Sequence, residues 1–331
     1  MRIRSKHVFI FSIFALIAIC INFIVASISP NLPKPGKRPI LYSNQMRQDL
    51  KMTCFKALKQ AKEHIHLVMY GLTDQKIINI LNKQSQNKLD IKVYYDKRSS
   101  VDLDLYPDQE IKVKSRGLMH QKILVLDKSL VFLGSANLTT ASLLMHDNLI
   151  VGFYSPEIAN FLIKKTPFQT GNLTTLVGGQ KIDVWLLPDL QNRALNKLTT
   201  LINNATNSIE VAMFTFTHPA LVEALINAKK RGVNVKVAID FQTKNGASKK
   251  AIETLKKESI TVIYNKEVKL CHHKHILIDE KLLICGSANW TKSAFSKNYD
   301  CLLILYSLDR TQKTFLKKLW RTIELESSFL K

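Results

Sequence analysis

One sequence pattern occurs twice in this chain: H-x-K, four residues, D, six residues, then G-S-x-N. The first copy runs from His120 to Asn137 and the second from His272 to Asn289. A lone His near a Lys is more often a packed or surface residue than a catalyst, whereas two matched sets at one spacing favour a working site. The chain is therefore predicted to contain two copies of one folding unit that share a site.

The similarity between the two halves extends well beyond this motif. Apolar residues at helical spacing from Leu50 to Ala61 return 144 residues later, from Ala194 to Ala205. Two strand-like segments keep the same offset: IHLVMYGL and IKVYYD correspond to IEVAMFTF and VKVAID. At the motif His the offset is 152, so the second half has gained eight residues after Asp240. The segment KNGASKK, which begins at Lys244, is predicted to be the loop that holds them.

In each half, amphipathic helices alternate with strands, which predicts an α/β fold with both faces of each sheet covered. We expect two tandem α-β-α sandwich lobes related by a pseudo-twofold axis, one over residues 40–166 and the other over residues 185–331. A connector over residues 167–184, which contains three of the glycines, would join them.

The N-terminus carries an apolar run from Val8 to Ile28 that follows three basic residues. Twenty-one apolar residues is long for the h-region of a signal peptide and sufficient for a transmembrane helix, so residues 1–28 are predicted to be an uncleaved signal anchor. The protein would then be held in a membrane by a single N-terminal span; cleavage of the segment would instead give a secreted protein. Residues 29–39 are Pro-rich and are expected to form an extended linker.

The chain is strongly basic, with 48 Lys and Arg against 26 Asp and Glu and a formal net charge of +22. Such an excess suits an anionic partner, either a phospholipid membrane surface or nucleic acid. Its five cysteines show neither zinc-ligand spacing nor a disulfide framework, so buried free thiols are expected.

The residue types of the motif suit chemistry at a phosphodiester. Each Lys stands two residues after its His, so on a strand both side chains point to the same face. One neutral imidazole can attack phosphorus, while the other, protonated, gives its proton to the leaving oxygen. No metal or cofactor is expected, because cationic and polar side chains can hold the non-bridging oxygens. The expected phosphate-binding residues are Lys122, Lys274, Ser135, Asn137, Ser287 and Asn289.

Each catalytic imidazole also needs a partner for its second nitrogen, which fixes its tautomer. Asp147 and Asp300 stand at similar places, ten and eleven residues after the last Asn of their motif. Both are predicted to orient a catalytic His.

The double motif resembles that of the phospholipase D superfamily, and the resemblance covers the chain from Ile40 to its C-terminal helix. It implies a two-lobed α/β fold of the phospholipase D type and a metal-free reaction through a phosphohistidine. It also implies that His120 is the nucleophile and His272 the general acid, with Asp127 and Asp279 supporting the architecture of the site. Family members generally have Glu where this chain has Asp147 and Asp300.

A membrane anchor and a positive charge favour a lipid substrate. We expect a membrane-anchored phospholipase D-type phosphodiesterase that hydrolyses phospholipid headgroup esters and works as a monomeric pseudo-dimer. The alternative is an endonuclease of the same family that cleaves DNA or RNA, because the compact catalytic part resembles the small nuclease and cardiolipin-hydrolase branch. A catalytically silent phosphate-binding protein would leave both motifs unexplained.

Overall fold

The computed structural model describes residues 30–265 and 269–328. The predicted signal anchor, residues 1–28, lies outside the described residues. Within the described ranges, none of the helices combines the length and the apolar character needed to cross a membrane. The described residues from Leu32 onward form one compact unit, which contains both copies of the motif.

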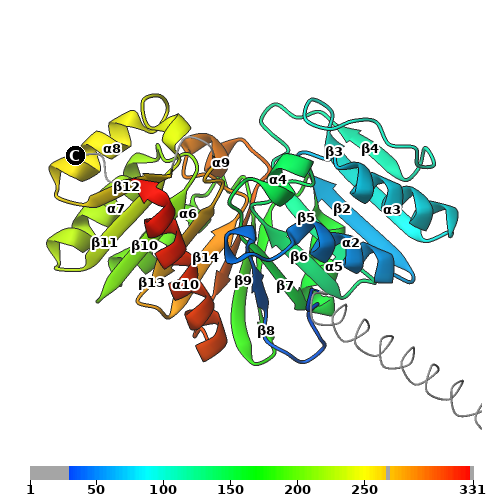
Figure 1. The fold of residues 1–331 in the computed structure, drawn as a ribbon, viewed down its shortest axis with the longest axis horizontal. Coiled ribbons are helices and arrows are strands. Elements are labelled where there is room, and N and C mark those ends of the chain that lie inside the picture. Colours follow the sequence, from blue (N-terminus) through cyan, green and yellow to red (C-terminus); the bar gives the residue numbers. More distant parts are fainter. Residues whose placement is uncertain (1–29, 266–268, 329–331) are drawn as a thin grey trace, which may run out of the picture. The chain divides into compact units, whose positions relative to one another are not determined.

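The first half of this unit is built on a seven-stranded sheet (Figure 1). Its strands, in spatial order, are β1 (Ile40–Tyr42), β7 (Ile150–Tyr154), β6 (Leu130–Gly134), β5 (Lys122–Leu126), β2 (His64–Met69), β3 (Asp90–Asp96) and β4 (Glu110–Val113). Strands β2, β3 and β4 run parallel to one another, and the remaining neighbours are antiparallel.

The second half repeats this order within a nine-stranded sheet. Its strands are β16 (Ser327–Ser328), β12 (Thr261–Asn265), β11 (Asn234–Ile239), β10 (Ser208–Met213), β13 (Lys274–Ile278), β14 (Leu282–Gly286), β15 (Cys301–Leu305), β9 (Gln180–Leu186) and β8 (Gly171–Val177). The seven strands from β12 to β9 match those from β4 to β1 one by one, with the same parallel and antiparallel pairings. The predicted internal repeat is thus a repeat of structure.

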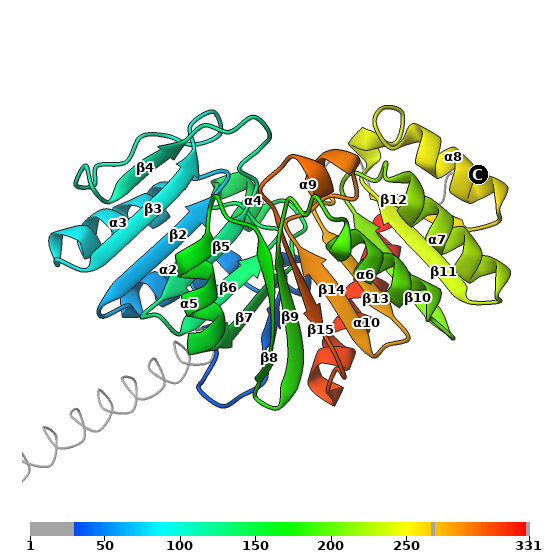
Figure 2. The ribbon, with the colours of Figure 1, turned by 180° about the vertical axis from the view of Figure 1, so that it is seen from behind.

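Helices cover both faces of each sheet, as expected for an α/β sandwich (Figure 2). Those of the first half are α2 (Leu50–Gln60), α3 (Gln75–Gln86), α4 (Thr140–Leu144) and α5 (Pro156–Lys165). Those of the second half are α6 (Arg193–Asn203), α7 (Pro219–Lys230), α8 (Lys249–Lys257), α9 (Lys292–Ser296) and α10 (Arg310–Glu326). Two short 3-10 helices, η1 (Asn44–Met46) and η2 (Phe241–Thr243), complete the described elements.

The buried apolar residues form three clusters that follow these layers. One lies between the first sheet and α2, α3 and α4, and another between the second sheet and α6, α7 and α8. The third joins the inner faces of both sheets with α5 and α10, so the two halves share a core. Strand residues alternate between clusters: Phe132 of β6 belongs to the outer cluster, and Val131 and Leu133 belong to the shared one. Both motifs therefore belong to one compact unit with a shared core.

The segment expected to be a connector, residues 167–184, contributes structure of its own. It contains β8 and most of β9, which form a hairpin along the edge of the second sheet beside β15 (Figures 1 and 2). Gly178 and Gly179, both with positive φ, make the turn of this hairpin. The sequence does not predict these strands, because β8 is half-exposed and lacks a continuous apolar run.

The eight extra residues of the second half fold differently from the expected loop. Residues 244–248 form a turn, but the segment continues directly into α8, which has no helical counterpart between β3 and β4. The Pro-rich linker also has contacts with the body from Leu32 onward: Pro33 and Pro39 are buried, and Arg38 donates to the carbonyl oxygen of Ser307. Four cysteines are described, and all are buried free thiols as expected: Cys54, Cys271, Cys285 and Cys301.

Candidate active site

The two motif histidines stand at equivalent places, each two residues before the first residue of a central strand. Lys122 begins β5 and pairs with Met69 of β2, while Lys274 begins β13 and pairs with Met213 of β10. Both lysines and both histidines are buried. Isolated β-bridges join Met119 to Tyr299 and Asp147 to Cys271, each beside a motif His, and so bring the two motifs into a single site.

His120 is oriented by a carboxylate from the other half of the chain. Its Nδ1 lies 2.8 Å from Oδ1 of Asp300, which is fully buried. Because a carboxylate only accepts, the Nδ1–H donates and Nε2 is left with its lone pair. Burial and the charge of Lys122 lower the pKa of His120, and Asp300 acts in the opposite direction. The prediction that Asp300 orients a motif His agrees with this geometry.

His272 is oriented by an amide. Its Nδ1 lies 2.9 Å from Oδ1 of Asn148, and the amide nitrogen of Asn148 donates to the carbonyl oxygens of Ser142 and His146. Those two bonds fix the amide, so the oxygen must face His272. Burial and the charge of Lys274 lower the pKa of His272 well below its ordinary value. The two histidines therefore differ in the charge of their partner.

The prediction that Asp147 orients a catalytic His is wrong. The backbone N–H of Asp147 donates to the carbonyl oxygen of Leu270, and the partner of His272 is the next residue along the chain. Asn148 stands 152 residues before Asp300, which is the offset between His120 and His272. The correct register was thus readable in the sequence, but the search for a carboxylate selected the neighbouring Asp.

The motif serines hold the orienting residues and are not placed to hold phosphate. Ser135 donates to Oδ1 of Asn148 at 2.8 Å, and Ser287 donates to Oδ1 of Asp300 at 2.7 Å. Each hydroxyl also accepts a backbone N–H, and the residues are 1% and 0% exposed. A hydroxyl has one proton, so neither serine can donate to a substrate as well. The predicted phosphate contacts of Ser135 and Ser287 are therefore corrected to positioning roles.

The two motif asparagines are partly exposed, as a phosphate-binding residue must be. Asn137 accepts a weak hydrogen bond from the backbone of Gly71 at 3.3 Å. Oδ1 of Asn289 has no hydrogen-bond partner within the described part of the chain. In an amide group only the nitrogen can donate to a phosphate oxygen, and the amide nitrogens of Asn137 and Asn289 make no hydrogen bond among the described residues, in contrast to the serine hydroxyls.

Each motif Lys is held in place by a hydrogen bond to the backbone of its motif His. Lys122 donates to the carbonyl oxygen of His120 at 2.7 Å, and Lys274 donates to that of His272 at 2.9 Å. Burial lowers the pKa of Lys122 to about 7, and burial together with the charge of Lys122 lowers that of Lys274 well below its ordinary value. A bound anion would offset this desolvation, so the site is electrostatically prepared for a phosphate.

Two aromatic rings that the motif does not predict, those of Tyr70 and Phe214, also line the site. Tyr70 lies edge-on to His120 with ring centroids 5.1 Å apart, and Phe214 lies 5.3 Å from His272. Each ring also faces the Lys of the same motif. The internal repeat could have identified both, because they are 144 residues apart. Tyr70 follows β2 and Phe214 follows β10, and these two strands pair with the motif strands β5 and β13.

The motif aspartates lie at the far end of the motif strands, in the turn of a hairpin. Asp127 accepts backbone N–H groups from Lys62, Glu63 and His64, and Asp279 accepts those of three residues that lead into β10. Both have positive φ, a conformation that Asp adopts more readily than most other residues. They anchor the neighbouring strand and do not touch the site, which agrees with the supporting role expected for them.

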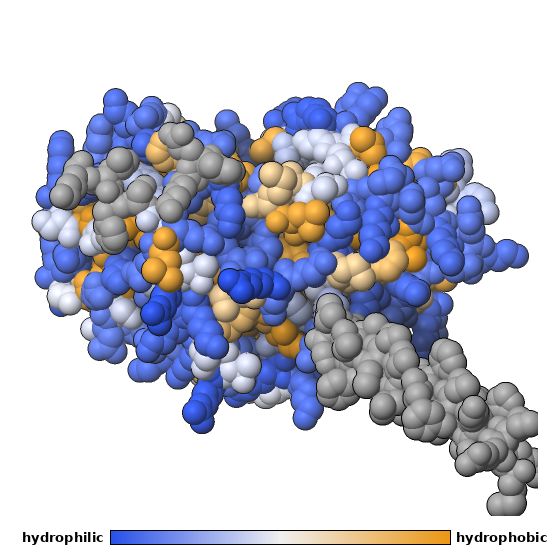
Figure 3. Space-filling model, in the orientation of Figure 1, coloured by the Kyte–Doolittle hydropathy of each residue, from blue (hydrophilic) through white to orange (hydrophobic). Residues whose placement is uncertain are grey.

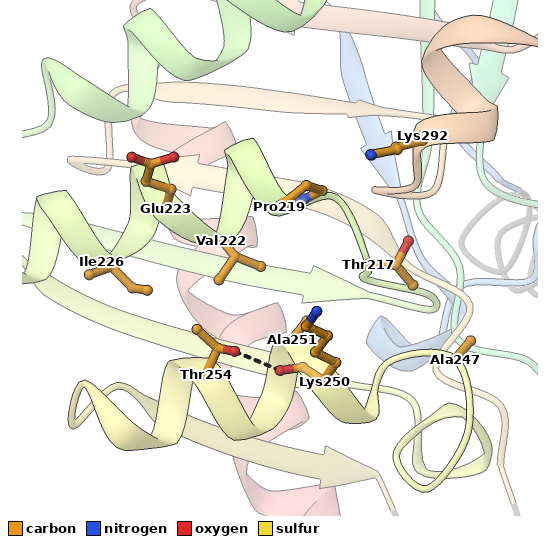
Figure 4. Close-up of a pocket in the computed structure, with 10 residues that line it drawn as sticks. All are labelled: Thr217, Pro219, Val222, Glu223, Ile226, Ala247, Lys250, Ala251, Thr254 and Lys292. Carbon is orange, nitrogen blue, oxygen red and sulfur yellow. Dashed lines mark hydrogen bonds between the residues drawn. The ribbon is translucent and has the colours of Figure 1, made fainter.

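An apolar groove of about 510 Å³ lies away from these residues, between α7 and α8 (Figure 4). Val222, Ile226 and Ala251 face its interior, and Lys292 of α9 stands at one end. None of its lining residues belongs to a motif.

Comparison with known proteins agrees with this geometry. A family model described as the PLD-like domain of cardiolipin synthase matches residues 54–166 and 198–323. Mouse mitochondrial cardiolipin hydrolase is 34% identical over 114 residues, which cover 34% of this chain and 50% of that protein. A phospholipase D of Rickettsia conorii is 33% identical over 104 residues, 31% of this chain and 52% of that protein. The chain thus spans about half the length of the curated relatives it matches.

The solved structure of phosphatidylserine synthase from Haemophilus influenzae is similar over nearly the whole chain. It superposes with a TM-score of 0.69 and covers 91% of this chain and 89% of its own, at 13% sequence identity, so the likeness is one of fold. The family model covers both repeats, including both motifs and the residues that orient their histidines. This chain belongs to the phospholipase D-like family.

Proposed function

We propose that the protein is a phospholipase D-type phosphodiesterase that hydrolyses phospholipid headgroup esters through a phosphohistidine. One observation carries this proposal: two buried histidines lie in one site but have chemically different hydrogen-bond partners. His120 is bonded to the carboxylate of Asp300, and His272 is bonded to the amide of Asn148. Family membership and the two enzymes named above support the same reaction class.

The first step forms a bond between Nε2 of His120 and phosphorus and breaks the bond from phosphorus to the headgroup oxygen. Protonated His272 gives its Nε2 proton to that oxygen, so the headgroup leaves as a neutral alcohol. His272, now neutral, takes a proton from water, and the resulting hydroxide attacks phosphorus. The P–N bond breaks, and phosphatidic acid and free His120 are released.

The partners of the two histidines support this division of roles. The Asp300 carboxylate increases the electron density at Nε2 of His120 and stabilises the positive charge that develops on the phosphorylated ring. The Asn148 amide has no charge, so His272 holds its additional proton less tightly and gives it up more readily. The negative charge of a bound phosphodiester offsets Lys122 and Lys274, and thereby raises the pKa of His272 enough for it to enter the reaction protonated.

A lipid substrate is favoured by exposed apolar residues beside the site. Leu144 and Met145, at the end of α4, are 53% and 60% exposed. The next residue, His146, has its ring 6.2 Å from that of His272. Polar residues dominate the face drawn in Figure 3, and the apolar residues exposed there form small separate patches. Apolar side chains at the rim, together with the net charge of +22, suit the surface of an anionic bilayer.

The substrate assay compares lipid and nucleic acid with the same preparation. Vesicles of phosphatidylcholine with phosphatidylglycerol or cardiolipin are incubated with the enzyme, and phosphatidic acid is separated by chromatography. Single-stranded DNA and RNA are supplied in parallel, with His120→Ala as the inactive control. We expect phosphatidic acid to be released, also in excess chelator. Cleavage of nucleic acid without any lipid turnover would replace this proposal by the endonuclease alternative, which the basic charge favours.

We further propose that residues 1–28 anchor the enzyme to its substrate membrane, on the basis of their composition. Full-length protein should stay with the membrane fraction after carbonate extraction, and a chain that begins at Leu32 should not. Release of both proteins would exclude an integral anchor.

A further inference from the structure

A third histidine, which belongs to neither motif, lies beside the general acid. The ring of His146 has its centroid 6.2 Å from that of His272, and the two ring planes are inclined by 49°. His146 is partly exposed, whereas His120 and His272 are buried. All the hydrogen bonds of His146 to described residues involve its backbone, so its ring nitrogens are free to meet a small molecule at the site.

One side chain links His146 to the general acid. The Oδ1 atom of Asn148 accepts from Nδ1 of His272 at 2.9 Å, and its Nδ2 atom donates to the carbonyl oxygen of His146 at 3.0 Å. The same carbonyl oxygen accepts from the side-chain amide of Asn44, and the N–H of His146 donates to the carbonyl oxygen of Ala141 at 2.9 Å. The backbone of His146 is therefore fixed relative to His272.

The internal repeat does not supply a fourth histidine on the other side. At the 152-residue offset, His146 corresponds to Asn298. Oδ1 of Asn298 accepts the backbone N–H of Leu118 at 3.0 Å, so this amide is used to join the two halves. The additional imidazole therefore stands only beside His272, which is the side where the proposed reaction releases the headgroup and takes in water.

The separation of the two rings suits one bridging water molecule. Two hydrogen bonds of about 2.8 Å placed end to end span roughly 5–6 Å. Because Nδ1 of His272 is bonded to Asn148, such a water meets Nε2, the atom that takes the proton of the attacking water. Burial and the charge of Lys274 lower the pKa of His146, which favours the neutral ring and leaves one ring nitrogen with a lone pair.

We propose that His146 positions the water that hydrolyses the phosphohistidine, and thereby makes water rather than an alcohol the preferred acceptor. This inference rests on the proposed function and extends it to the choice of acceptor. The water oxygen forms a bond to phosphorus as the P–N bond to His120 breaks, and one water proton passes to Nε2 of His272.

The second proton of the water distinguishes it from an alcohol. It donates to the neutral ring of His146 during the attack and stays on the oxygen, which becomes the new P–OH group. An alcohol has a single hydroxyl proton, which must go to His272, so it has none left for His146. His146 therefore stabilises the attack of water and not that of an alcohol.

The test measures how the phosphorylated enzyme is shared between two acceptors. The substrate is bis(p-nitrophenyl) phosphate, a soluble diester, in water with one fixed concentration of ethanol. Chromatography separates the hydrolysis product, p-nitrophenyl phosphate, from the transfer product, ethyl p-nitrophenyl phosphate. The variants are His146→Phe, which keeps a ring without an acceptor, and His146→Gln, which keeps an acceptor oxygen. The matched control is His218→Phe, since the ring of His218 lies outside both motifs and against Phe295.

His146→Phe should raise the ratio of transfer to hydrolysis about tenfold, because only the attack of water loses a hydrogen bond. His146→Gln should keep the ratio within about threefold of the wild type, and the control variant should keep the wild-type ratio. An unchanged ratio in folded His146→Phe, an equal fall of hydrolysis and transfer, or the same change in the control would overturn the proposal.

Rapid mixing without ethanol shows which step has changed. In His146→Phe, the first release of p-nitrophenol should stay within about threefold of the wild-type rate, and later turnovers should slow about tenfold. A burst of p-nitrophenol should then appear, and phosphorylated protein should accumulate in samples quenched with alkali. Slowing of the first release to the same extent would show a structural role for His146 and refute its role in holding water.

The soluble diester also separates failure of this inference from failure of the proposed function. It contains neither a lipid nor a nucleotide, so its turnover does not depend on which of them is the natural substrate. A wild type that forms neither product would refute the proposed function, and this inference with it. A wild type that forms both products in a ratio insensitive to His146→Phe would refute this inference alone.

Discussion

His120 and Asp300 are 180 residues apart in the chain and form a 2.8 Å hydrogen bond from Nδ1 to Oδ1. In the equivalent contact, His272 is bonded to Asn148 of the first half. Each half thus orients the histidine of the other, and neither half contains a complete catalytic unit. The crossed contacts also make the two histidines unequal, because one partner is a carboxylate and the other an amide.

Replacing Asn148 by Asp should give both histidines a carboxylate partner and so bring their pKa values closer together. A carboxylate opposite Nδ1 stabilises the imidazolium, so the pKa of His272 should rise and its proton should be transferred less readily. We expect kcat to fall about tenfold and the acidic limb of the kcat/KM profile to move to higher pH, measured with deacylated phosphatidylglycerol. The substitution also removes the hydrogen bonds from the Asn148 amide nitrogen to the carbonyl oxygens of Ser142 and His146. A thermal unfolding measurement therefore checks that the variant is folded. An unchanged pH profile in a folded variant would contradict the assigned roles.

Ser287 and Asn289 are two residues apart, yet their substitutions should have opposite effects. Ser287→Ala removes a donor to Asp300 and an acceptor for the backbone of Cys301, both buried, and should destabilise the fold by about 1–3 kcal/mol. Asn289→Ala should leave stability within about 0.5 kcal/mol, because Oδ1 of Asn289 has no partner among the described residues. It should instead lower kcat/KM about tenfold, as expected for a lost phosphate contact. Denaturant unfolding and steady-state kinetics distinguish the two outcomes.

The charge of Lys122 should limit activity on the alkaline side. Burial lowers the pKa of this ammonium group to about 7, so it is protonated below about pH 7 and neutral above it. Because the neutral amine cannot attract a phosphodiester, kcat/KM should fall as pH rises through this value. The affinity for tungstate, a phosphate analogue, should decline in parallel. Constant tungstate affinity up to pH 9 would show that the lysine keeps its proton in the free enzyme.

Asp147→Asn should stabilise the protein and leave catalysis intact. Burial, with the negative charge of Glu326, raises the pKa of Asp147 to about 7, so its ionised form is disfavoured in the folded state. The resulting loss of stability is absent below the unfolded pKa near 3.8, and develops as pH rises to about 7. The variant should therefore gain about 1–3 kcal/mol in unfolding free energy at pH 8 and little at pH 4. Loss of activity would reinstate Asp147 as an orienting residue.

Much of the site was predictable because the repeat preserves both residue identity and spacing. His120, His272 and the two lysines were found from the motif, and the register of Asn148 follows from the same offset. The roles of Ser135 and Ser287 were not predictable, since a serine near a phosphodiester suggests a phosphate contact until its burial is known. The hairpin of β8 and β9 was missed because β8 lies at a sheet edge, where a half-exposed strand needs no continuous apolar face.

The sequence by itself determined the α/β class, the two equivalent halves and the histidines and lysines of the candidate site, because these depend on local periodicity and on identity at fixed spacing. Only the tertiary structure decided which residue orients which histidine, since those contacts cross between halves that are far apart in the chain. It alone also placed the ring of His146 beside that of His272, a long-range contact without a local signal in either segment. Their separation is set by Asn148, whose amide is bonded to both residues.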